Sequence, residues 1–358
     1  MNTDDAVLPE LTRRQEEILS CIVRAYTDSP EPISSKYLVE TFNLSFSTAT
    51  VRNEMAVLEE LGFISAPHTS AGRIPTENGY RYFVKRLITP GDISTIEKSR
   101  ISDRLKTIPL ASEQWMLLVA TMLARTANVA ALVTPPVADT SRFKHVELIA
   151  IQGRLVLMVL VLQGGSVQQQ MLTLAEPVPQ PKLGETAERI NGLCMDMSAK
   201  EVRVRSVQMQ LLEREVAELA ADSMDKADTN QVRLIYRNGL SEVLGLFESS
   251  EGAQQAVRVF EERAFLSLIL NDVLTPLVNS VQVVIAGNGR WEQLSHLSMV
   301  LSRYGIPGQI SGAVGVLGPT RINYGRAISA VSYVSGLMTD MLTDVYENLP
   351  PGEVESGD

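Results

Sequence analysis

The chain has 358 residues, of which 45% are hydrophobic and 21% charged, and a formal net charge of -10 at pH 7. A chain of this length buries hydrophobic cores in two or three domains, and its composition is typical of a globular protein. The acidic excess argues against a protein that coats nucleic acid without regard to sequence, because neutralising phosphates supplies most of the nonspecific affinity. A sequence-specific DNA-binding protein is not excluded.

Two cysteines, Cys21 and Cys194, are too few for a disulfide framework or a metal-binding cluster. The three histidines lie far apart, without the acidic or cysteine neighbours typical of a metal site or a catalytic relay. No basic and apolar leader begins the chain, and its apolar runs are too short to cross a bilayer. We therefore expect a cytoplasmic protein with no membrane anchor, metal, cofactor or catalytic residue.

Taken in chain order, residues 1–10 are acidic and predict a mobile arm. A helix over residues 12–26 is followed by a short helix that begins after Ser34, a residue suited to capping a helix. After a tight turn, a third helix is predicted over residues 47–61, and Gly62 can adopt the left-handed conformation that ends helices. This spacing is typical of a helix-turn-helix.

A wing follows the third helix. Residues 63–66 predict a strand, residues 67–72 a turn-rich tip and residues 73–75 a returning strand. Thr76 can cap a last helix over residues 77–87. Four polar side chains of the tip and the returning strand suit contacts to the DNA backbone or the minor groove. They are His68, Thr69, Ser70 and Arg73.

The third helix has one apolar side, formed by Val51, Met55 and Leu58, which predicts packing against the first two helices. The opposite side carries groups that bind base edges and phosphates. Asparagine can bond an adenine edge, arginine a guanine edge, and alanine or threonine methyl groups can touch a thymine methyl group. The predicted DNA-binding residues of this helix are Ser47, Thr48, Ala49, Thr50, Arg52 and Asn53.

Beyond residue 90, a connecting helix is predicted over residues 94–106 and an apolar helix over residues 111–128. A short strand over residues 129–133 comes next. Three extended runs within residues 143–174 then predict an antiparallel meander. Its middle run, residues 155–162, is apolar at nearly every position, which predicts a strand that is covered on both faces.

Residues 183–276 have a mostly helical pattern. A strand over residues 281–287, a helix over residues 291–304, a strand over residues 309–317 and a long helix over residues 321–348 follow. A sheet that is interrupted by helices and resumed later indicates an inserted subdomain, and we place the insertion near residues 198–276. The expected fold class is α+β.

Several stretches of the sequence resemble the HrcA family of heat-inducible transcription repressors. Their longest run is PHTSAGRIPT at residues 67–76, followed by GYRY at residues 79–82. Residues 11–15 and 47–55 resemble the family's first and recognition helices, and GVLGPTRINY at residues 315–324 resembles its C-terminal signature. The resemblance spans nearly the whole chain.

The resemblance implies three domains. These are a winged-helix domain at residues 11–90, a GAF-like domain in two parts at residues 91–197 and 277–348, and a mostly helical dimerisation domain inserted at residues 198–276. Residues 349–358 are expected to form a mobile tail.

Two glycine-containing segments need separate treatment. The turn GNGR at residues 287–290 lacks the glycine spacing and the acidic partner of phosphate-binding loops, so we interpret it as a tight strand-to-helix turn. It departs from the family, where an Ile-Gly-acidic-Asn motif is expected. Gly312, Gly315 and Gly318, in and near the C-terminal signature, predict close backbone packing rather than a pocket.

The family resemblance implies a dimeric repressor, not an enzyme, that binds an inverted-repeat operator of chaperone genes and is supported by a GroEL-type chaperonin. Two alternatives stay open at this point. One is a ligand-sensing regulator whose GAF-like domain binds a metabolite. The other is an enzyme formed by residues 111–348, although this region lacks a recognisable cluster of nucleophile, base and orienting group.

Overall fold

The computed structural model describes residues 9–68, 72–88, 93–110, 112–138, 141–163, 167–229, 234–247, 249–275, 277–307 and 309–347. Two compact units make up the chain. The first contains Met1–Pro136, Arg233–Ile306 and Gly312–Asp358, and the second, called here the inserted unit, contains Val137–Val232 and Pro307–Ser311. Most of the predicted arm and the whole predicted tail lie outside the described residues.

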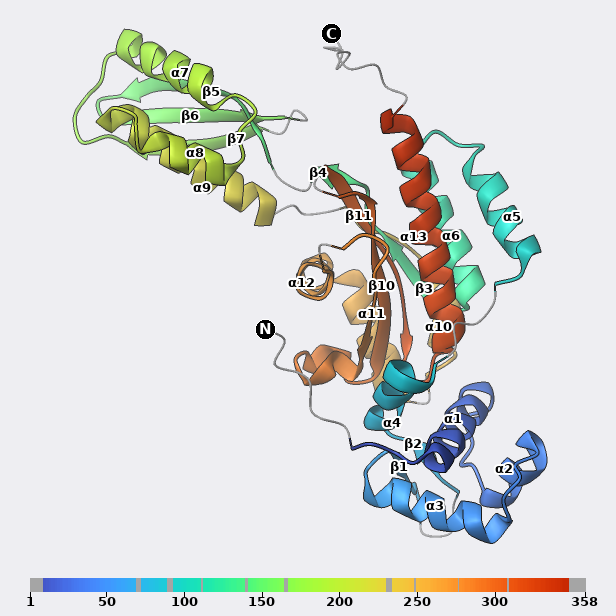
Figure 1. Ribbon diagram of the computed structural model, residues 1–358. Coiled ribbons are helices and arrows are strands. Elements are labelled where there is room, and N and C mark those ends of the chain that lie inside the picture. The colour runs from blue at the N-terminus through green and yellow to red at the C-terminus, as the bar shows by residue number, and fades with distance from the viewer. Residues whose placement is uncertain are drawn as a thin grey trace. The chain divides into compact units, whose positions relative to one another are not determined.

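The first unit begins with a winged helix, which we call the DNA module and which ends at residue 88 (Figure 1). It consists of α1 (Arg13–Asp28), α2 (Ser35–Phe42), α3 (Thr48–Glu60), β1 (Ile64–Ser65), β2 (Ile74–Pro75), α4 (Glu77–Tyr82) and the π-helical turn η1 (Phe83–Leu87). The predicted caps are confirmed, because the side chains of Ser34 and Thr76 accept hydrogen bonds from the first turns of α2 and α4. Gly62 has a φ of 76°, as predicted for the end of α3.

The rest of the first unit is the central domain, which begins at residue 93. Its sheet has the strand order β8-β3-β11-β10-β9, with antiparallel pairing of β8 with β3, β3 with β11 and β10 with β9. The strands are β3 (Ala130–Val133), β8 (Tyr236–Asn238), β9 (Val281–Ile285), β10 (Leu297–Ile306) and β11 (Ile310–Pro319).

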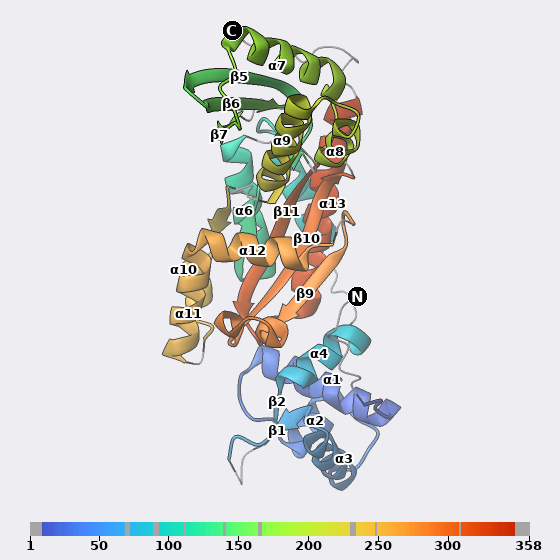
Figure 2. The ribbon, with the colours of Figure 1, turned by 90° about the vertical axis from the view of Figure 1, so that its left-hand side faces the viewer.

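Helices cover both faces of this sheet (Figures 1 and 2). α6 (Glu113–Ala127) and α13 (Tyr324–Glu347) pack on one face, together with α5 (Thr95–Leu105), in a core that is continuous with that of the DNA module. α11 (Ser250–Glu261) and α12 (Arg263–Val273) pack on the other. The remaining elements are α10 (Leu240–Leu244), η2 (Ala286–Gly289) and η3 (Glu292–Leu294).

The prediction of a helix over residues 291–304 is wrong. The short turn η3 is followed by β10, a strand between β9 and β11 whose residues are nearly all buried. Leu297, Val300, Leu301 and Tyr304 have the spacing of a helix face, but each of them is fully buried. A strand that is covered on both faces has no polar alternation, so periodicity does not distinguish it from a buried helix.

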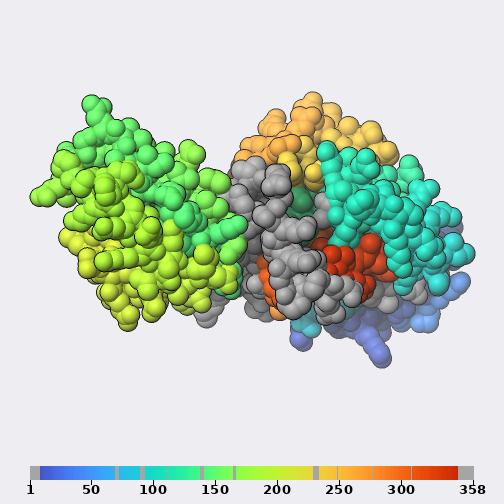
Figure 3. All heavy atoms as spheres, turned by 90° about the horizontal axis from the view of Figure 1, so that it is seen from above, coloured from blue at the N-terminus to red at the C-terminus, as the bar shows by residue number. Residues whose placement is uncertain are grey.

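The inserted unit has a sheet and a core of its own. Its strands β5 (Phe143–Gln152), β6 (Leu155–Leu162) and β7 (Val167–Thr173) form the predicted antiparallel meander. α7 (Gln180–Cys194), α8 (Ala199–Ser206) and α9 (Leu211–Thr229) pack with it in a separate hydrophobic cluster (Figure 2). The short strand β4 (Val137–Ala138) precedes β5 and pairs with Ile310 and Ser311 at the start of β11, so it belongs to the other sheet. In Figure 3 the green-to-yellow atoms of these strands and helices form one closely packed body.

The compact unit therefore differs from the insertion expected at residues 198–276, and it is mixed rather than mostly helical. The meander had been placed in the GAF-like sheet, but its strands pair only with one another. α10, α11 and α12, which had been placed in the insertion, pack in the core of the central domain. Hydrophobic patterns identify strands and helices, but they do not tell which core each element joins.

Helix α7 closes one edge of the small sheet. The side chain of Asn191 accepts a hydrogen bond from the Val146 N–H (2.7 Å) and donates one to the Val146 carbonyl (3.1 Å). Gln180 likewise accepts from the Ala150 N–H (2.7 Å) and donates to the Leu148 carbonyl (2.8 Å). The two amides occupy backbone groups of β5 that a further strand would otherwise use.

The face of this sheet opposite α7 and α9 carries exposed apolar side chains, beside Glu147 and Gln169, which lie in register with Val159. Alternate residues of β6 are buried, whereas Leu155 is 40% exposed. Ile149, Leu157 and Met171 lie in register across the three strands, and Ile149 and Met171 are 43% and 51% exposed. Within the described residues of this unit, the middle strand is thus covered on one face and not on both.

In the part of the chain that the structure describes, no helix is long and apolar enough to span a bilayer.

Candidate nucleic-acid interface

The recognition helix α3 presents the predicted side to solvent. Val51, Met55 and Leu58 are buried against the other helices of the DNA module, which confirms the predicted packing side. Ala49, Arg52 and Asn53 are exposed. No interaction is recorded for the Arg52 and Asn53 side chains among the described residues, so both side chains are available for base edges.

The N-terminus of α3 is preorganised by its cap. The Ser47 side chain accepts a hydrogen bond from the Thr50 N–H (3.1 Å), and the hydroxyls of Ser47 and Thr50 lie 2.9 Å apart. These two hydroxyls therefore shape the helix end. The first N–H groups of a helix, here those of Thr48 and Ala49, have no acceptor within it, and together with the helix dipole they suit a phosphate.

The orientation of α3 is fixed by a contact that the sequence did not predict. Glu54 accepts hydrogen bonds from Arg14 (3.1 Å) and Gln15 (3.1 Å), both in the first turn of α1. The Arg14 guanidinium also lies 5.1 Å from the centre of the Phe46 ring. These contacts tie the middle of the recognition helix to α1, so the exposed side of α3 is held in one direction.

The wing residues divide into three groups. His68 is exposed near the tip, and Thr69 and Ser70 lie outside the described residues. Arg73 is partly buried, and its guanidinium binds Glu59 Oε2 through Nε (2.9 Å) and Nη2 (2.8 Å). Its backbone also pairs with Ile33 in both directions. Arg73 thus holds the wing against α3, a pairing that no local sequence signal indicates because 14 residues separate the partners.

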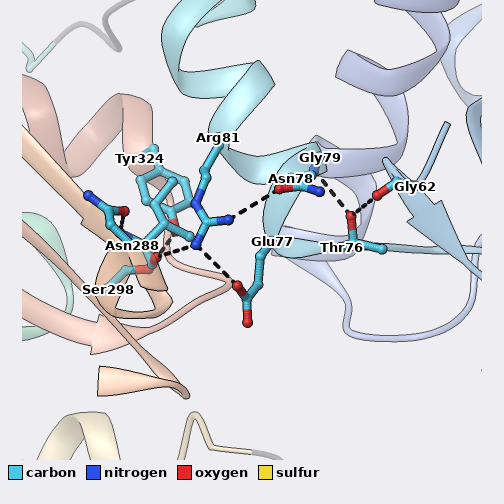
Figure 4. Close-up of polar contacts among 10 residues, drawn as sticks. Gly62, Thr76, Glu77, Asn78, Gly79, Arg81, Asn288, Ser298 and Tyr324 are labelled. Atoms are coloured by element: carbon cyan, nitrogen blue, oxygen red, sulfur yellow. Dashed lines mark hydrogen bonds and ion pairs between the residues drawn. The ribbon is translucent and has the colours of Figure 1, made fainter. Parts of the chain in front are cut away.

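The segment after the wing is a scaffold for the DNA module. A Cβ atom on Gly79 would lie 2.1 Å from the Phe63 carbonyl oxygen, so only glycine allows α4 to approach the wing strand. Tyr82 donates a hydrogen bond to Glu16 (2.9 Å) and packs edge-on against Phe63. Burial, with the hydrogen bond to Glu16, raises the pKa of Tyr82. The Thr76 hydroxyl donates to the carbonyl of Gly62 (2.6 Å), as Figure 4 shows.

The glycines in and near the C-terminal signature pack closely, as expected. Cβ atoms on Gly312, Gly315 and Gly318 would lie 2.4 to 2.6 Å from neighbouring atoms. The end of the signature differs from the expectation, because it does line a pocket. A cavity of about 320 Å³ lies between Ile322–Gly325 of the central domain and α1, α2 and η1 of the DNA module.

Among the described residues, the cysteines and the possible metal ligands offer little further chemistry. Cys21 and Cys194 are buried, and burial raises the pKa of each thiol to about 11. Within the described ranges, no group of three or more histidine, cysteine, aspartate or glutamate side chains is arranged to hold a metal ion.

Comparison with known proteins agrees with this geometry. Residues 10–87 match the family model for the winged helix-turn-helix transcription repressor, HrcA DNA-binding domain, and residues 113–328 match that for the HrcA protein C terminal domain. A crystal structure of a hypothetical protein has a similar fold, with a TM-score of 0.56 and 24% identity, and the match covers 94% of this chain and 99% of that chain.

Two curated relatives are named heat-inducible transcription repressor HrcA. The one from Herpetosiphon aurantiacus is 40% identical, over 94% of this chain and 97% of its own. The one from Roseiflexus castenholzii is 39% identical, over 97% of this chain and 99% of its own. Such relatives are DNA-binding regulators and not enzymes. With both family models matched over most of its length, the chain belongs to the HrcA family of winged-helix transcription repressors.

Proposed function

We propose that the protein represses heat-shock (chaperone) genes in the cytoplasm by binding an inverted-repeat operator as a homodimer, and that a GroEL-type chaperonin supports its active form. The observation that carries this proposal is the exposed side of α3, where Ala49, Arg52 and Asn53 stand next to a capped helix N-terminus. The protein performs no chemistry. It acts by occupying promoter DNA.

The DNA contacts divide into two kinds. Arg52 and Asn53 read base edges in the major groove, with the Ala49 methyl group against a thymine. The N-terminus of α3 and the wing tip contact phosphates, which fix the position of the module without reading sequence. Phosphate contacts come from Ser47, Thr48, Thr50, His68, Thr69 and Ser70. Arg73 contributes mainly by holding the wing on α3 through Glu59.

The open face of the β5-β6-β7 sheet supports the dimer. Ile149, Leu155 and Met171 are each at least 40% exposed, and they form an apolar patch on one face of the sheet. A second copy that packs the same face against this one would remove these side chains from water. The resulting two-fold axis would match the symmetry of an inverted repeat.

The dimer is tested with Met171→Glu in the full-length protein. Met171 is 51% exposed, so a glutamate there is tolerated in the folded monomer, but two-fold packing would bury two carboxylates in an apolar interface. Sedimentation velocity should show a dimer for the wild type and a monomer for Met171→Glu. Ile96→Glu is the matched control, because Ile96 is an apolar residue of the central domain that is 73% exposed. A dimeric Met171→Glu protein would contradict this interface.

Operator binding is tested by fluorescence anisotropy of the full-length protein at one stated salt concentration. Three DNAs are compared: an inverted-repeat promoter element, an isolated half-site and a shuffled sequence. Tight binding to the intact repeat alone supports a dimeric repressor. Equal and weak binding to all three contradicts it.

The chaperonin is tested in the same assay. A chaperonin that rescues incompetent conformations raises the fraction of competent repressor, so it should increase the amplitude of specific binding. A denatured-client competitor should reverse the increase. If neither addition changes operator binding, the chaperonin does not support the active form of the protein.

A further inference from the structure

Arg81 joins the DNA module to the central domain. Its Nη2 atom donates a hydrogen bond to the carbonyl of Ile285 (3.1 Å), the last residue of β9. The same guanidinium pairs with Glu77 (3.1 Å) and donates to the side chain of Asn78 (3.2 Å), both on α4. Figure 4 shows the side chain leaving α4 and pointing toward the central domain. The Asn78 carboxamide and the Glu77 carboxylate hold the guanidinium in place for its contact with β9.

The acceptor carbonyl is held in place by an unusual turn. Ala286, Gly287, Asn288 and Gly289 follow Ile285 and have φ values of 48°, 68°, 51° and 76°. Asparagine tolerates this left-handed region, whereas alanine adopts it only where the surrounding structure requires it. The Asn288 side chain accepts a hydrogen bond from the Ile285 N–H (3.0 Å) and so restrains the residue whose carbonyl is the acceptor.

An aromatic contact lies beside the Arg81 contact. Tyr80 packs on Tyr324, with ring centres 5.8 Å apart. Tyr324 is buried, and its hydroxyl donates to the carbonyl of Thr320 (2.6 Å) and therefore accepts from Ser298, 2.7 Å away. Burial raises the pKa of Tyr324, so its hydroxyl stays protonated near neutral pH. The central domain therefore offers α4 a rigid platform.

A cavity lies at another part of the boundary between the DNA module and the central domain. The cavity of about 320 Å³ is lined by Val23 and Phe83 of the DNA module and by Ile322 and Asn323 of the central domain. The cavity leaves this part of the boundary incompletely packed, although the hydrophobic core runs from one domain into the other elsewhere. The Arg81 hydrogen bond and the Tyr80–Tyr324 ring contact add directional restraints to this boundary, and both would be lost if the DNA module rotated.

We propose that Arg81 is a positioning residue for operator recognition: with the Ala286–Gly289 turn it latches the DNA module onto the central domain and so fixes the separation of the two recognition helices. This inference rests on the proposed dimeric function. Half-sites of an inverted repeat have one spacing, and a dimer whose modules rotate freely meets that spacing only part of the time. Loss of the latch therefore lowers affinity for the intact repeat and broadens the range of spacings accepted.

The test uses full-length Arg81→Ala, Arg81→Lys and Asn288→Ala, with operators in which the spacer between half-sites is lengthened or shortened base pair by base pair. Arg81 makes its contacts away from the exposed side of α3, so Arg81→Ala should bind an isolated half-site with an affinity within about twofold of the wild type. Its affinity for the intact repeat should be at least about tenfold lower than that of the wild type. Its dependence on spacer length should flatten. Arg81→Lys should restore part of the preference, and Asn288→Ala should reproduce the flattening.

Arg326→Ala is the matched control. Arg326 makes the same kind of contacts, to the Thr126 carbonyl (2.5 Å) and to Glu97 (2.8 Å), but entirely within the central domain. It should lower stability without changing the spacing profile. A wild-type spacing profile in Arg81→Ala, or an equal change in Arg326→Ala, would overturn the latch.

A second readout needs no DNA. Spin labels at Glu60→Cys and Arg100→Cys, both exposed, report the distance between α3 and the central domain, and labelled protein is diluted with unlabelled protein so that only pairs within one chain are seen. The distance distribution should broaden in Arg81→Ala and not in Arg326→Ala. If the wild type does not prefer the repeat over the half-site, the dimeric function fails. An unchanged distance distribution refutes the latch itself.

Discussion

A dimer would carry two copies of Arg52, so replacing this residue by alanine should remove two base contacts from the complex with the intact operator. Arg52 is exposed on α3 and pairs with no side chain among the described residues of the module, so its loss removes a base contact without leaving a buried partner unsatisfied. One arginine contact to a guanine edge contributes about 1–3 kcal/mol of discrimination, or about 5- to 160-fold in affinity for a half-site. Two copies on an intact repeat give about 2–6 kcal/mol, or about 30- to 25,000-fold.

The relation between the two losses is the sensitive part of this prediction. On a logarithmic scale, the loss on the intact repeat should be twice the loss on the half-site. Anisotropy competition at one fixed salt concentration measures both, and circular dichroism checks that the fold is unchanged. The slope of affinity against salt should stay the same, because a base contact neutralises no phosphate. Arg100→Ala, at an exposed arginine of α5, controls for the lost charge.

Two results would refute this reasoning. Unchanged affinity on both DNAs would exclude Arg52 from the readout of sequence. Equal losses on the repeat and the half-site would mean that only one of the two modules reads the DNA, and the two-fold arrangement would then be wrong.

Three further predictions concern the interior. Gly79→Ala should destabilise the DNA module by about 1–3 kcal/mol, because the methyl group would lie 2.1 Å from a main-chain oxygen, and an unchanged thermal midpoint would contradict the proposed steric contact. Tyr324→Phe should cost about 1–3 kcal/mol by leaving buried polar groups unpaired, and adding Ser298→Ala should recover part of the loss in a denaturation cycle. Burial raises the pKa of Cys21 and Cys194 to about 11, so both thiols should resist a thiol reagent at pH 8 until the protein unfolds, which a rapid reaction of the native protein would disprove.

The DNA module was predictable because its signals are local. A capping side chain, a left-handed glycine and a three-to-four-residue apolar spacing each act within a few residues, and the caps at Ser34 and Thr76 and the turn at Gly62 are all found in the structure. The buried side of α3 follows from the same spacing. Which residues contact DNA stays a prediction.

The contacts that orient the module were not predictable, because they join residues far apart in the sequence. Arg81 and Ile285 are separated by 204 residues, and Arg14 and Glu54 by 40. A charged side chain carries no sign of its partner in the sequence. Arg73 shows the consequence, since a cation next to the wing tip suggests a DNA contact, whereas its guanidinium binds Glu59.

The bounds expected for the insertion differ from those of the inserted unit for a related reason. β6 is apolar on both faces, and a sequence pattern does not tell whether the second face meets a helix, another domain or another copy of the chain. The meander was therefore joined to the wrong sheet.

The amides of Gln180 and Asn191 protect the β5 edge of the small sheet from the addition of another strand. A bare strand edge is a template on which chains add without end, and heating, which loosens proteins, favours that addition. Here the backbone groups of Val146, Leu148 and Ala150 at the β5 edge are already bonded to α7. Strand addition at the β5 edge is therefore suppressed, and the proposed dimer, which would use the exposed face of the sheet, is not extended by strand pairing at that edge.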